Sequence, residues 1–240
     1  MSTPELQLHT LFVLDGRGRI TSTREPAASL GPLFFLVRSA TACAWAVRAD
    51  VSRVVSDELD ALARQEPPVA DLRQAPVHAQ RYTALVSSGR DATRVSQSGG
   101  PAFTFPDALS QPSGIMTIED EAQLRDDFRG WLPGEIAAGR APVLAVVEAG
   151  PAVSLCFCAW RSDVAAEAGL HTAEPYRRRG FGARASAAWA LAIRASGRVP
   201  LYSTAWTNES SLAVARSLGL FAYACDWSLL DPHSVVTAPA

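Results

Sequence analysis

The sequence contains no lysine, so all 22 of its basic residues are arginines. This absence excludes reactions that form a Schiff base on a lysine side chain. No apolar run reaches the roughly 20 residues that a membrane-spanning helix needs. The first residues, MSTPELQLHT, lack a basic region followed by an apolar stretch, which predicts no signal peptide. We therefore expect a cytoplasmic protein with no membrane partner.

The sequence has neither a large net charge nor a spacing of residues typical of metal ligands. The 22 basic and 24 acidic side chains give a net charge of −2, which gives no reason to expect nucleic-acid binding. The histidines are scattered and show no metal-ligand spacing, so no metal is expected; they are His9, His78, His171 and His233. Cys156 and Cys158 are two apart in an apolar run and should share one strand face. We favour buried, reduced thiols for this pair over a zinc site or a disulfide.

Residues 1–110 predict an accessory α/β region. LFVLDGRGRITS predicts two short strands around a turn, because Asp15-Gly16 offers turn chemistry between apolar runs. GPLFFLVRSA and TACAWAVRAD follow as a strand pair, and apolar spacing predicts helices over 51–65 and near 74–88. Residues 89–114 are rich in Ser, Gly, Pro and Gln, which indicates a linker or a long flap.

Residues 115–231 predict a second domain of α/β class with a mixed sheet, and residues 232–240 a disordered tail. A helix interrupted by Pro133-Gly134 is expected over 119–138. PVLAVVEA and AVSLCFCAWR then form a hairpin, and EAGLHTA is a third strand. Helices over 180–196 and 208–218 should alternate with the strands LYSTAW and FAYACDWSLL.

The segment EAGLHTAEPYRRRGFGARASAAWA carries the clearest chemistry. An extended run leads into three arginines, then Gly-Phe-Gly, then a helix. Glycines at a strand-to-helix turn let backbone N–H groups approach a ligand, and the helix N-terminus favours an anion. Arginines beside it add charge for phosphate groups. A plain glycine-rich turn with solvated arginines remains the alternative, while GFGARA fits neither a dinucleotide-binding fingerprint nor a P-loop.

These residues resemble a known family. Arg177 to Gly182 reads RRRGFG and is similar to the R/Q-x-x-G-x-G/A signature of the GCN5-related N-acetyltransferase (GNAT) superfamily. The downstream segment WTNESSLAVARSLGL is similar to the last conserved motif of that family. The resemblance covers about residues 115–231 and implies a GNAT-like fold that uses acetyl-CoA.

The resemblance also implies which residues hold the cofactor. The strand at Leu170, His171 and Thr172 would pair its backbone with the pantetheine arm. The start of the later helix, Asn208 and Ser211, would touch the cofactor, although Asn208 is also a favoured helix N-cap. The pyrophosphate would lie against Arg177, Arg178, Arg179, Gly180, Phe181, Gly182 and Ala183.

Acetyl transfer to an amine needs a group that accepts a proton from the amine. Glu167 is the family-like candidate and Glu148 the second, each with a solvated strand-end carboxylate as its alternative. The family often places a tyrosine acid where this sequence has Ala215. The acid is then Tyr223, Tyr202 or a water molecule, and we assign Tyr223.

The sequence thus predicts an acetyl-CoA-dependent N-acetyltransferase acting on a primary amine of a small molecule, with peptide N-termini or lysines as other acceptors. The alternative is a degenerate GNAT fold that binds acyl-CoA as a sensor or partner module without turnover. Residues 1–110 could serve dimerisation, which leaves a homodimer as one expectation. Trp131 lies by the Pro-Gly break, where it packs in the core or lines an acceptor pocket.

Overall fold

The computed structural model describes residues 3–88, 94–124, 128, 131, 134–232 and 234. These residues form two compact units, and each unit is built from segments that are separate in the sequence. Unit 1 contains the described residues up to Ala102, together with Thr204–Thr207 and those from Ala222 onward. Unit 2 contains Phe103–Ser203 and Asn208–Phe221. The chain is therefore not divided near residue 110 into two continuous segments, because the last strand belongs with the N-terminal residues.

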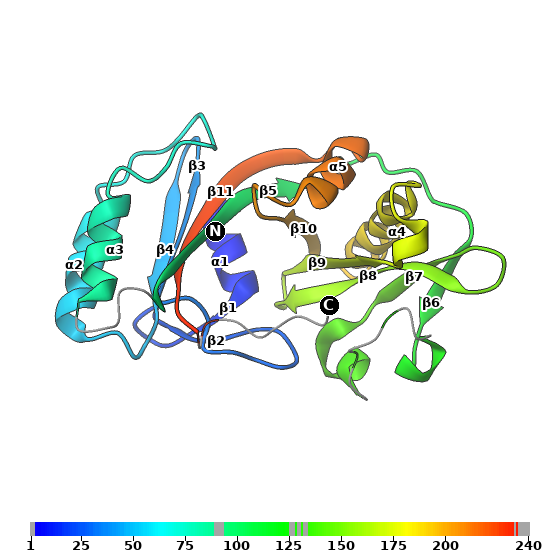
Figure 1. The fold of residues 1–240 in the computed structure, drawn as a ribbon, viewed down its shortest axis with the longest axis horizontal. Coiled ribbons are helices and arrows are strands. Elements are labelled where there is room, and N and C mark those ends of the chain that lie inside the picture. The colour runs from blue at the N-terminus through cyan, green and yellow to red at the C-terminus, as the bar shows by residue number, and fades with distance from the viewer. Residues whose placement is uncertain are drawn as a thin grey trace. The chain divides into compact units, whose positions relative to one another are not determined.

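Unit 1 is a sheet with helices on both faces (Figure 1). Its sheet has the order β4-β3-β11-β5, and β3 pairs antiparallel with both β4 and β11. A separate hairpin, β1-β2, surrounds the predicted turn at Asp15-Gly16. The elements are α1 (Thr3–Leu11), β1 (Phe12–Leu14), β2 (Ile20–Thr23), β3 (Phe34–Ser39), β4 (Cys43–Val47), α2 (Arg53–Ala63), α3 (Ala79–Ser87), β5 (Ser96–Thr104) and β11 (Phe221–Leu230).

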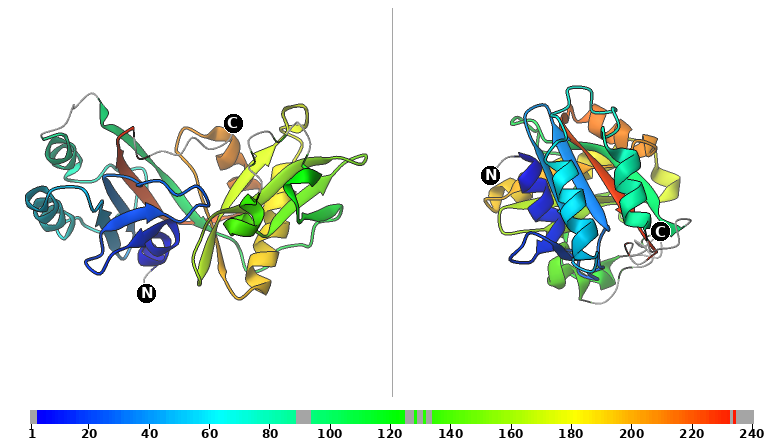
Figure 2. Two further views of the ribbon diagram at one scale, coloured as in Figure 1. Left: turned by 90° about the horizontal axis from the view of Figure 1, so that it is seen from below. Right: turned by 90° about the vertical axis from the view of Figure 1, so that its left-hand side faces the viewer.

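Local sequence explains how these helices are placed. The Ser52 hydroxyl accepts a hydrogen bond from the Val55 amide at 3.4 Å and caps α2. Figure 2 shows α2 and α3 side by side over one face of the strands. Tyr82 of α3 is fully buried there against the ring of Phe34. Helix α1, which the sequence did not predict, packs against β3 and β4 from the other side.

The predicted linker over 89–114 is wrong for its central part. Residues 96–104 form β5, which lies next to β11 at the end of the unit 1 strand order, while residues 89–93 lie outside the described residues. Gly99 and Gly100 gave this stretch its loop-like composition. They are needed because a Cβ on Gly100 would lie 1.7 Å from the Thr204 carbonyl oxygen. Close backbone approach, and not a flexible loop, accounts for these glycines.

Unit 2 is a mixed sheet of order β10-β9-β8-β7-β6, with β9 and β10 parallel and the other pairs antiparallel. This confirms the predicted hairpin and the mixed α/β class. Helix α4 packs against β7, β8 and β9. The elements are β6 (Ile115–Ile118), η2 (Glu121–Gln123), η4 (Ile136–Arg140), β7 (Val143–Val147), β8 (Ala152–Arg161), β9 (Ala165–Thr172), η5 (Glu174–Tyr176), α4 (Phe181–Ala195), β10 (Val199–Ser203) and α5 (Glu209–Ser217).

The predicted helix over 119–138 is also wrong. The described part of this region holds only the short helices η2 and η4, and residues 125–127, 129–130 and 132–133 lie outside the described residues. Asp120 and Leu124, which flank η2, have extended backbone with ψ of 135° and 133°, so a longer helix cannot run through them. The predicted tail, 232–240, lies outside the described residues apart from Pro232 and Ser234.

Candidate active site

Unit 2 contains a cleft of about 630 Å³ between the end of β9, the turn that leads into α4, and α5. Its size suits a small-molecule or cofactor site. Most of the residues predicted to hold the cofactor line it. They are Leu170, His171, Thr172, Arg177, Arg178, Gly180, Phe181, Gly182, Ala183, Asn208 and Ser211.

The first wall of the cleft is an edge of β9. This strand pairs with β8 along its length, but its register with β10 covers only Ala165–Glu167. Beyond that point the two parallel strands part, and Leu170, His171 and Thr172 line the cleft. A strand edge offers backbone N–H and C=O groups to an extended ligand. The cleft can therefore take a ligand with amide groups along this edge.

The second wall is the N-terminus of α4. Gly180 precedes the helix with φ of +80°, which glycine adopts without strain. The first helical bond runs from the Arg184 amide to the Gly180 carbonyl at 3.2 Å. The amides of residues 181–183 come before it and have no acceptor within the helix. Together with the helix dipole they make this helix start a candidate anion site.

Gly182 keeps this anion site open. A Cβ at this position would lie 3.2 Å from Leu170 Cδ2 and 3.4 Å from Thr172 Oγ1. Such a side chain would fill the space between β9 and α4. The second glycine of the predicted motif therefore sets how closely a ligand can approach the amides.

The three arginines take different positions. Arg177 and Arg178 line the cleft, and Arg177 Nε donates to the Thr172 carbonyl at 3.2 Å. Arg179 does not line it. Its guanidinium lies 3.7 Å from Glu148 Oε1 and over the rings of Tyr176 and Phe181. The structure thus brings two of the three predicted arginines to the anion site.

The third wall is α5. Asn208 Oδ1 accepts a hydrogen bond from the Ser211 amide at 3.1 Å, which confirms the predicted N-cap. Sequence reasoning missed four cleft residues on this helix, Ser210, Ala213, Val214 and Ser217. Their spacing of three, four and seven residues defines one helix face, and this periodicity could have identified them.

Glu167 lies where β9 and β10 begin to part. It is 1% exposed, lies beside Leu201 of β10, and is not among the residues that line the cleft. Strand alternation puts it on the same face as Gly169 and His171. That face carries aromatic rings, since Phe157 lies against Gly169 and the rings of Phe157 and Trp131 are 4.9 Å apart.

The two candidate tyrosines differ in location. Tyr223 belongs to unit 1, bonds to Gln7 Oε1 at 3.0 Å and does not line the cleft. Tyr202 belongs to unit 2, and its hydroxyl donates to the carbonyl of Ser211, a cleft residue, at 3.3 Å. Burial raises the pKa of Tyr202 to about 12, so its hydroxyl stays protonated at neutral pH.

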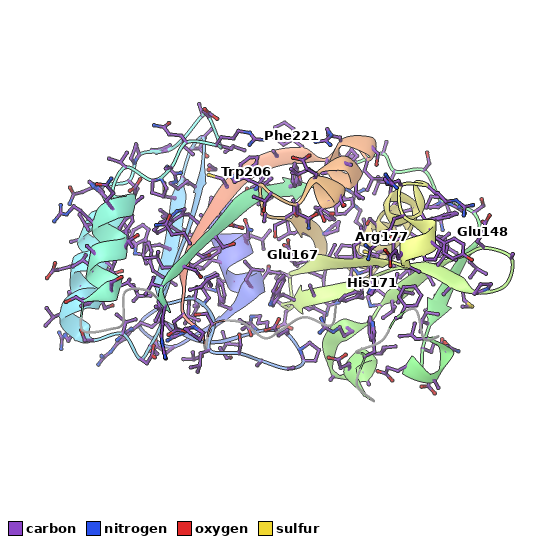
Figure 3. All side chains as sticks on the ribbon, in the orientation of Figure 1. Glu148, Glu167, His171, Arg177, Trp206 and Phe221 are labelled. Carbon is purple, nitrogen blue, oxygen red and sulfur yellow. The ribbon has the colours of Figure 1, made fainter. Side chains whose placement is uncertain are left out.

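The surroundings of His171 favour the neutral form of its imidazole. Burial lowers its pKa, and the charge of Arg177 lowers it further. Its ring lies edge-on to Phe128, with centroids 5.2 Å apart. Figure 3 shows His171 beside Arg177 near the end of β9, apart from Glu167.

Cys156 and Cys158 are buried free thiols on the α4 side of the sheet, and burial raises the pKa of Cys158 to about 11. Such thiols pack as apolar groups. Among the described residues, no group of His, Cys, Asp and Glu could hold a metal ion. The described helices include none that is both long and apolar enough to cross a membrane.

Comparison with known families finds one that is similar to part of the chain. Residues 143–230, which carry β7 to β11, match the family model for GNAT acetyltransferases. Over these residues the chain is similar to the GNAT acetyltransferases. A search of curated proteins finds no significant match to the sequence.

Several solved structures are similar to the chain at low identity. A protein assigned to the GNAT acetyltransferases from Novosphingobium aromaticivorans is 21% identical, over 57% of this chain and 66% of that chain, with a TM-score of 0.47. A GCN5-related N-acetyltransferase-like protein from Streptococcus suis is 15% identical, over 83% and 84%, with a TM-score of 0.48. A GCN5-related N-acetyltransferase from Kribbella flavida is 19% identical, over 62% and 63%, with a TM-score of 0.44. The chain spans just under two thirds of the first and third of these proteins.

Proposed function

We propose that the protein is an N-acetyltransferase that moves the acetyl group of acetyl-CoA to a primary amine of a small molecule. The observation that carries this proposal is the cleft, where an open edge of β9 meets the amides of α4 and two arginines. A ligand that is amide-rich at one end and phosphorylated at the other matches this order of groups.

Each part of acetyl-CoA has a counterpart in the cleft. The pantetheine amides would bond to the β9 edge at Leu170–Thr172. The pyrophosphate would accept bonds from the amides of residues 181–183, with Arg177 and Arg178 balancing its charge. Asn208 and Ser211 would contact the cofactor at the start of α5. Acetyl-CoA supplies the acetyl group as a thioester that an amine can attack directly.

The proposed reaction needs a neutral amine at the thioester carbonyl. Glu167 would take the proton of the amine, directly or through a water molecule, because it lies where β9 and β10 begin to part, three residues before the cleft residue Leu170. Backbone N–H groups of β9 would stabilise the oxygen of the attacked carbonyl. No covalent enzyme intermediate is required.

Tyr202 now replaces Tyr223 as our proposed acid for the thiolate leaving group. The Tyr202 hydroxyl donates a hydrogen bond to the carbonyl of the cleft residue Ser211, and it is protonated at neutral pH. Strand alternation places it on the face of the sheet opposite Glu167, which would put acid and base on the two sides of the reacting bond.

The test of this function is the variant Glu167→Gln. We expect kcat to fall by about 10²- to 10³-fold in an amine-acetylation assay, as for loss of a general base. The dissociation constant for acetyl-CoA should stay unchanged, because Glu167 is not a cleft residue. Glu148→Gln is the matched control, since Glu148 is half-exposed and paired with Arg179. Equal activity of both variants would contradict the assignment of Glu167.

The second candidate is an acyl-CoA-binding module without turnover. Ala215 favours it, because this buried alanine stands where the family often has its tyrosine acid. Binding of acetyl-CoA with no turnover over a broad panel of primary amines would support this candidate. Turnover of any amine would exclude it.

A further inference from the structure

Unit 1 contains its own pocket of about 340 Å³, and none of its residues lines the cleft described above. It lies among the loop before α3, the start of β5, residues 205–207 and β11. Its lining consists of Arg38, Leu72, Arg73, Gln74, Ala75, Pro76, Gln97, Ser98, Gly99, Ala205, Trp206, Thr207, Cys225, Asp226 and Trp227.

The floor of this pocket is fixed by backbone packing. Trp206 N donates to the Gly99 carbonyl at 3.2 Å, which ties the segment of Trp206 to β5. A Cβ on Gly99 would lie 2.6 Å from the carbonyl oxygen of Asp226, so only glycine allows β5 and β11 to approach this closely. The pocket is thus built on ordered strands.

Two guanidinium groups line the pocket. Arg73 lies over the ring of Trp206, with its Cζ 4.3 Å from the ring centroid. This cation–π contact orients the guanidinium and leaves the N–H groups at its rim available to an acceptor. Figure 3 marks the position of Trp206.

Arg38 is the second guanidinium and is 2% exposed. It donates to the carbonyls of Gln74 and Ala75 and so anchors the loop that carries Arg73. Its nearest carboxylate, Glu66, is 3.9 Å away and also accepts bonds from the Tyr82 hydroxyl and two backbone amides. Arg38 therefore holds the loop in place with its charge met by Glu66, and Arg73 is the guanidinium that would meet the charge of a ligand.

The remaining lining sets the character of the ligand. Asp226 is the one carboxyl group among the lining residues, and burial raises its pKa to about 7, which reduces its negative charge near neutral pH. Leu72, Pro76 and the two tryptophans supply apolar walls. A compact ligand with a flat apolar body and one negative charge fits this combination.

We propose that this pocket binds a small aromatic carboxylate, with the carboxylate held by Arg73 above Trp206 and the ring against the apolar walls. This site goes beyond the proposed acetyl transfer and stands or falls independently of it. Carboxylate suits the planar guanidinium because both oxygens can accept parallel bonds.

The experiment uses the full chain labelled with 5-fluorotryptophan and benzoate as the probe. The ¹⁹F resonance of Trp206 is assigned by its loss in Trp206→Phe. We expect this resonance to shift in a saturable way with benzoate, and benzamide, which lacks the charge, to bind about tenfold more weakly or worse. Arg73→Gln should weaken benzoate binding by a similar factor.

Arg53→Gln is the matched control, because Arg53 is an arginine of unit 1 whose side chain is 84% exposed on α2. It should leave benzoate binding unchanged. A shift of equal size with benzamide, equal affinity in Arg73→Gln, or no shift at millimolar benzoate would each overturn the proposal. An unchanged thermal melt of Arg73→Gln shows that a loss of binding is not a loss of fold.

Discussion

Ala183 is the residue at which binding and folding can be separated most cleanly. It is the third residue of α4 and lines the cleft beside the free amides. An acidic side chain in the first turn of a helix interacts favourably with the helix dipole. The same negative charge would oppose a phosphate at these amides. One substitution therefore has opposite effects on the two properties.

We expect Ala183→Asp to raise the dissociation constant for acetyl-CoA by at least about tenfold, since it adds a negative charge that repels the phosphates of the ligand. The thermal midpoint should stay equal or rise. Isothermal calorimetry and thermal denaturation measure the two effects. Ala61→Asp on the exposed surface of α2 is the control and should bind acetyl-CoA like the unchanged protein. Equal affinity of both variants would contradict the anion site at α4.

Most of the residues that line the cleft could be predicted from the sequence. The tyrosine proposed as the acid for the thiolate could not. The sequence around Gly180 and Gly182 has a local signal, because a turn and a helix start need no distant partner. Tyr202 and Tyr223 stand in similar apolar strands, and tertiary contacts separate them, since Tyr202 bonds to Ser211 of the cleft and Tyr223 to Gln7 of unit 1. Local sequence also could not show that Arg179 points away from the cleft while Arg177 and Arg178 line it. Its position depends on a tertiary contact with Glu148.

Among the elements, β5 packs so closely against neighbouring backbone that Gly99 and Gly100 leave no room for a side chain. Gly100→Ala would push a methyl group against the Thr204 carbonyl, 1.7 Å from the ideal Cβ position. We expect a loss of roughly 1–3 kcal/mol or more in the free energy of unfolding, as for overpacked sites. Urea denaturation measures this loss. Gly16→Ala is the matched control, because its Cβ would have no neighbour within 4 Å. A Gly100→Ala protein as stable as this control would contradict the close packing around β5.

The elements that could be predicted are those whose signal is local. The hairpin of β7 and β8 and the helices α4 and α5 follow from alternation, helix periodicity and capping, and the structure confirms them. Strand β5 has no such signal, since Ser96–Thr104 reads SQSGGPAFT and is ordered by its neighbours. Helix α1 has little amphipathic pattern and also depends on tertiary packing, with Leu8 and Leu11 buried.

On the scale of the whole molecule, the interleaved chain makes the two units inseparable by a simple cut. Strand β11 pairs with β3 from Ala224 opposite Ser39 to Leu229 opposite Phe34. A boundary near residue 110 was a natural prediction from composition, but no local pattern reveals that the last strand pairs with residues almost 200 positions earlier.

A chain that begins at residue 111 should therefore fail to fold cooperatively, because β11 loses both β3 and β5. Near-ultraviolet circular dichroism during a thermal scan measures this. A sharp transition in the truncated chain, with near-native aromatic signals, would show that residues 111–231 fold as an independent domain.

The central claim is that the cleft of unit 2 binds acetyl-CoA through β9, α4 and α5. Calorimetric titration of the full chain with acetyl-CoA, with NAD and ATP as comparison ligands, tests it most directly. The account predicts selective binding of acetyl-CoA that Ala183→Asp weakens. A folded protein that does not bind acetyl-CoA, or binds ATP and NAD equally well, would contradict it.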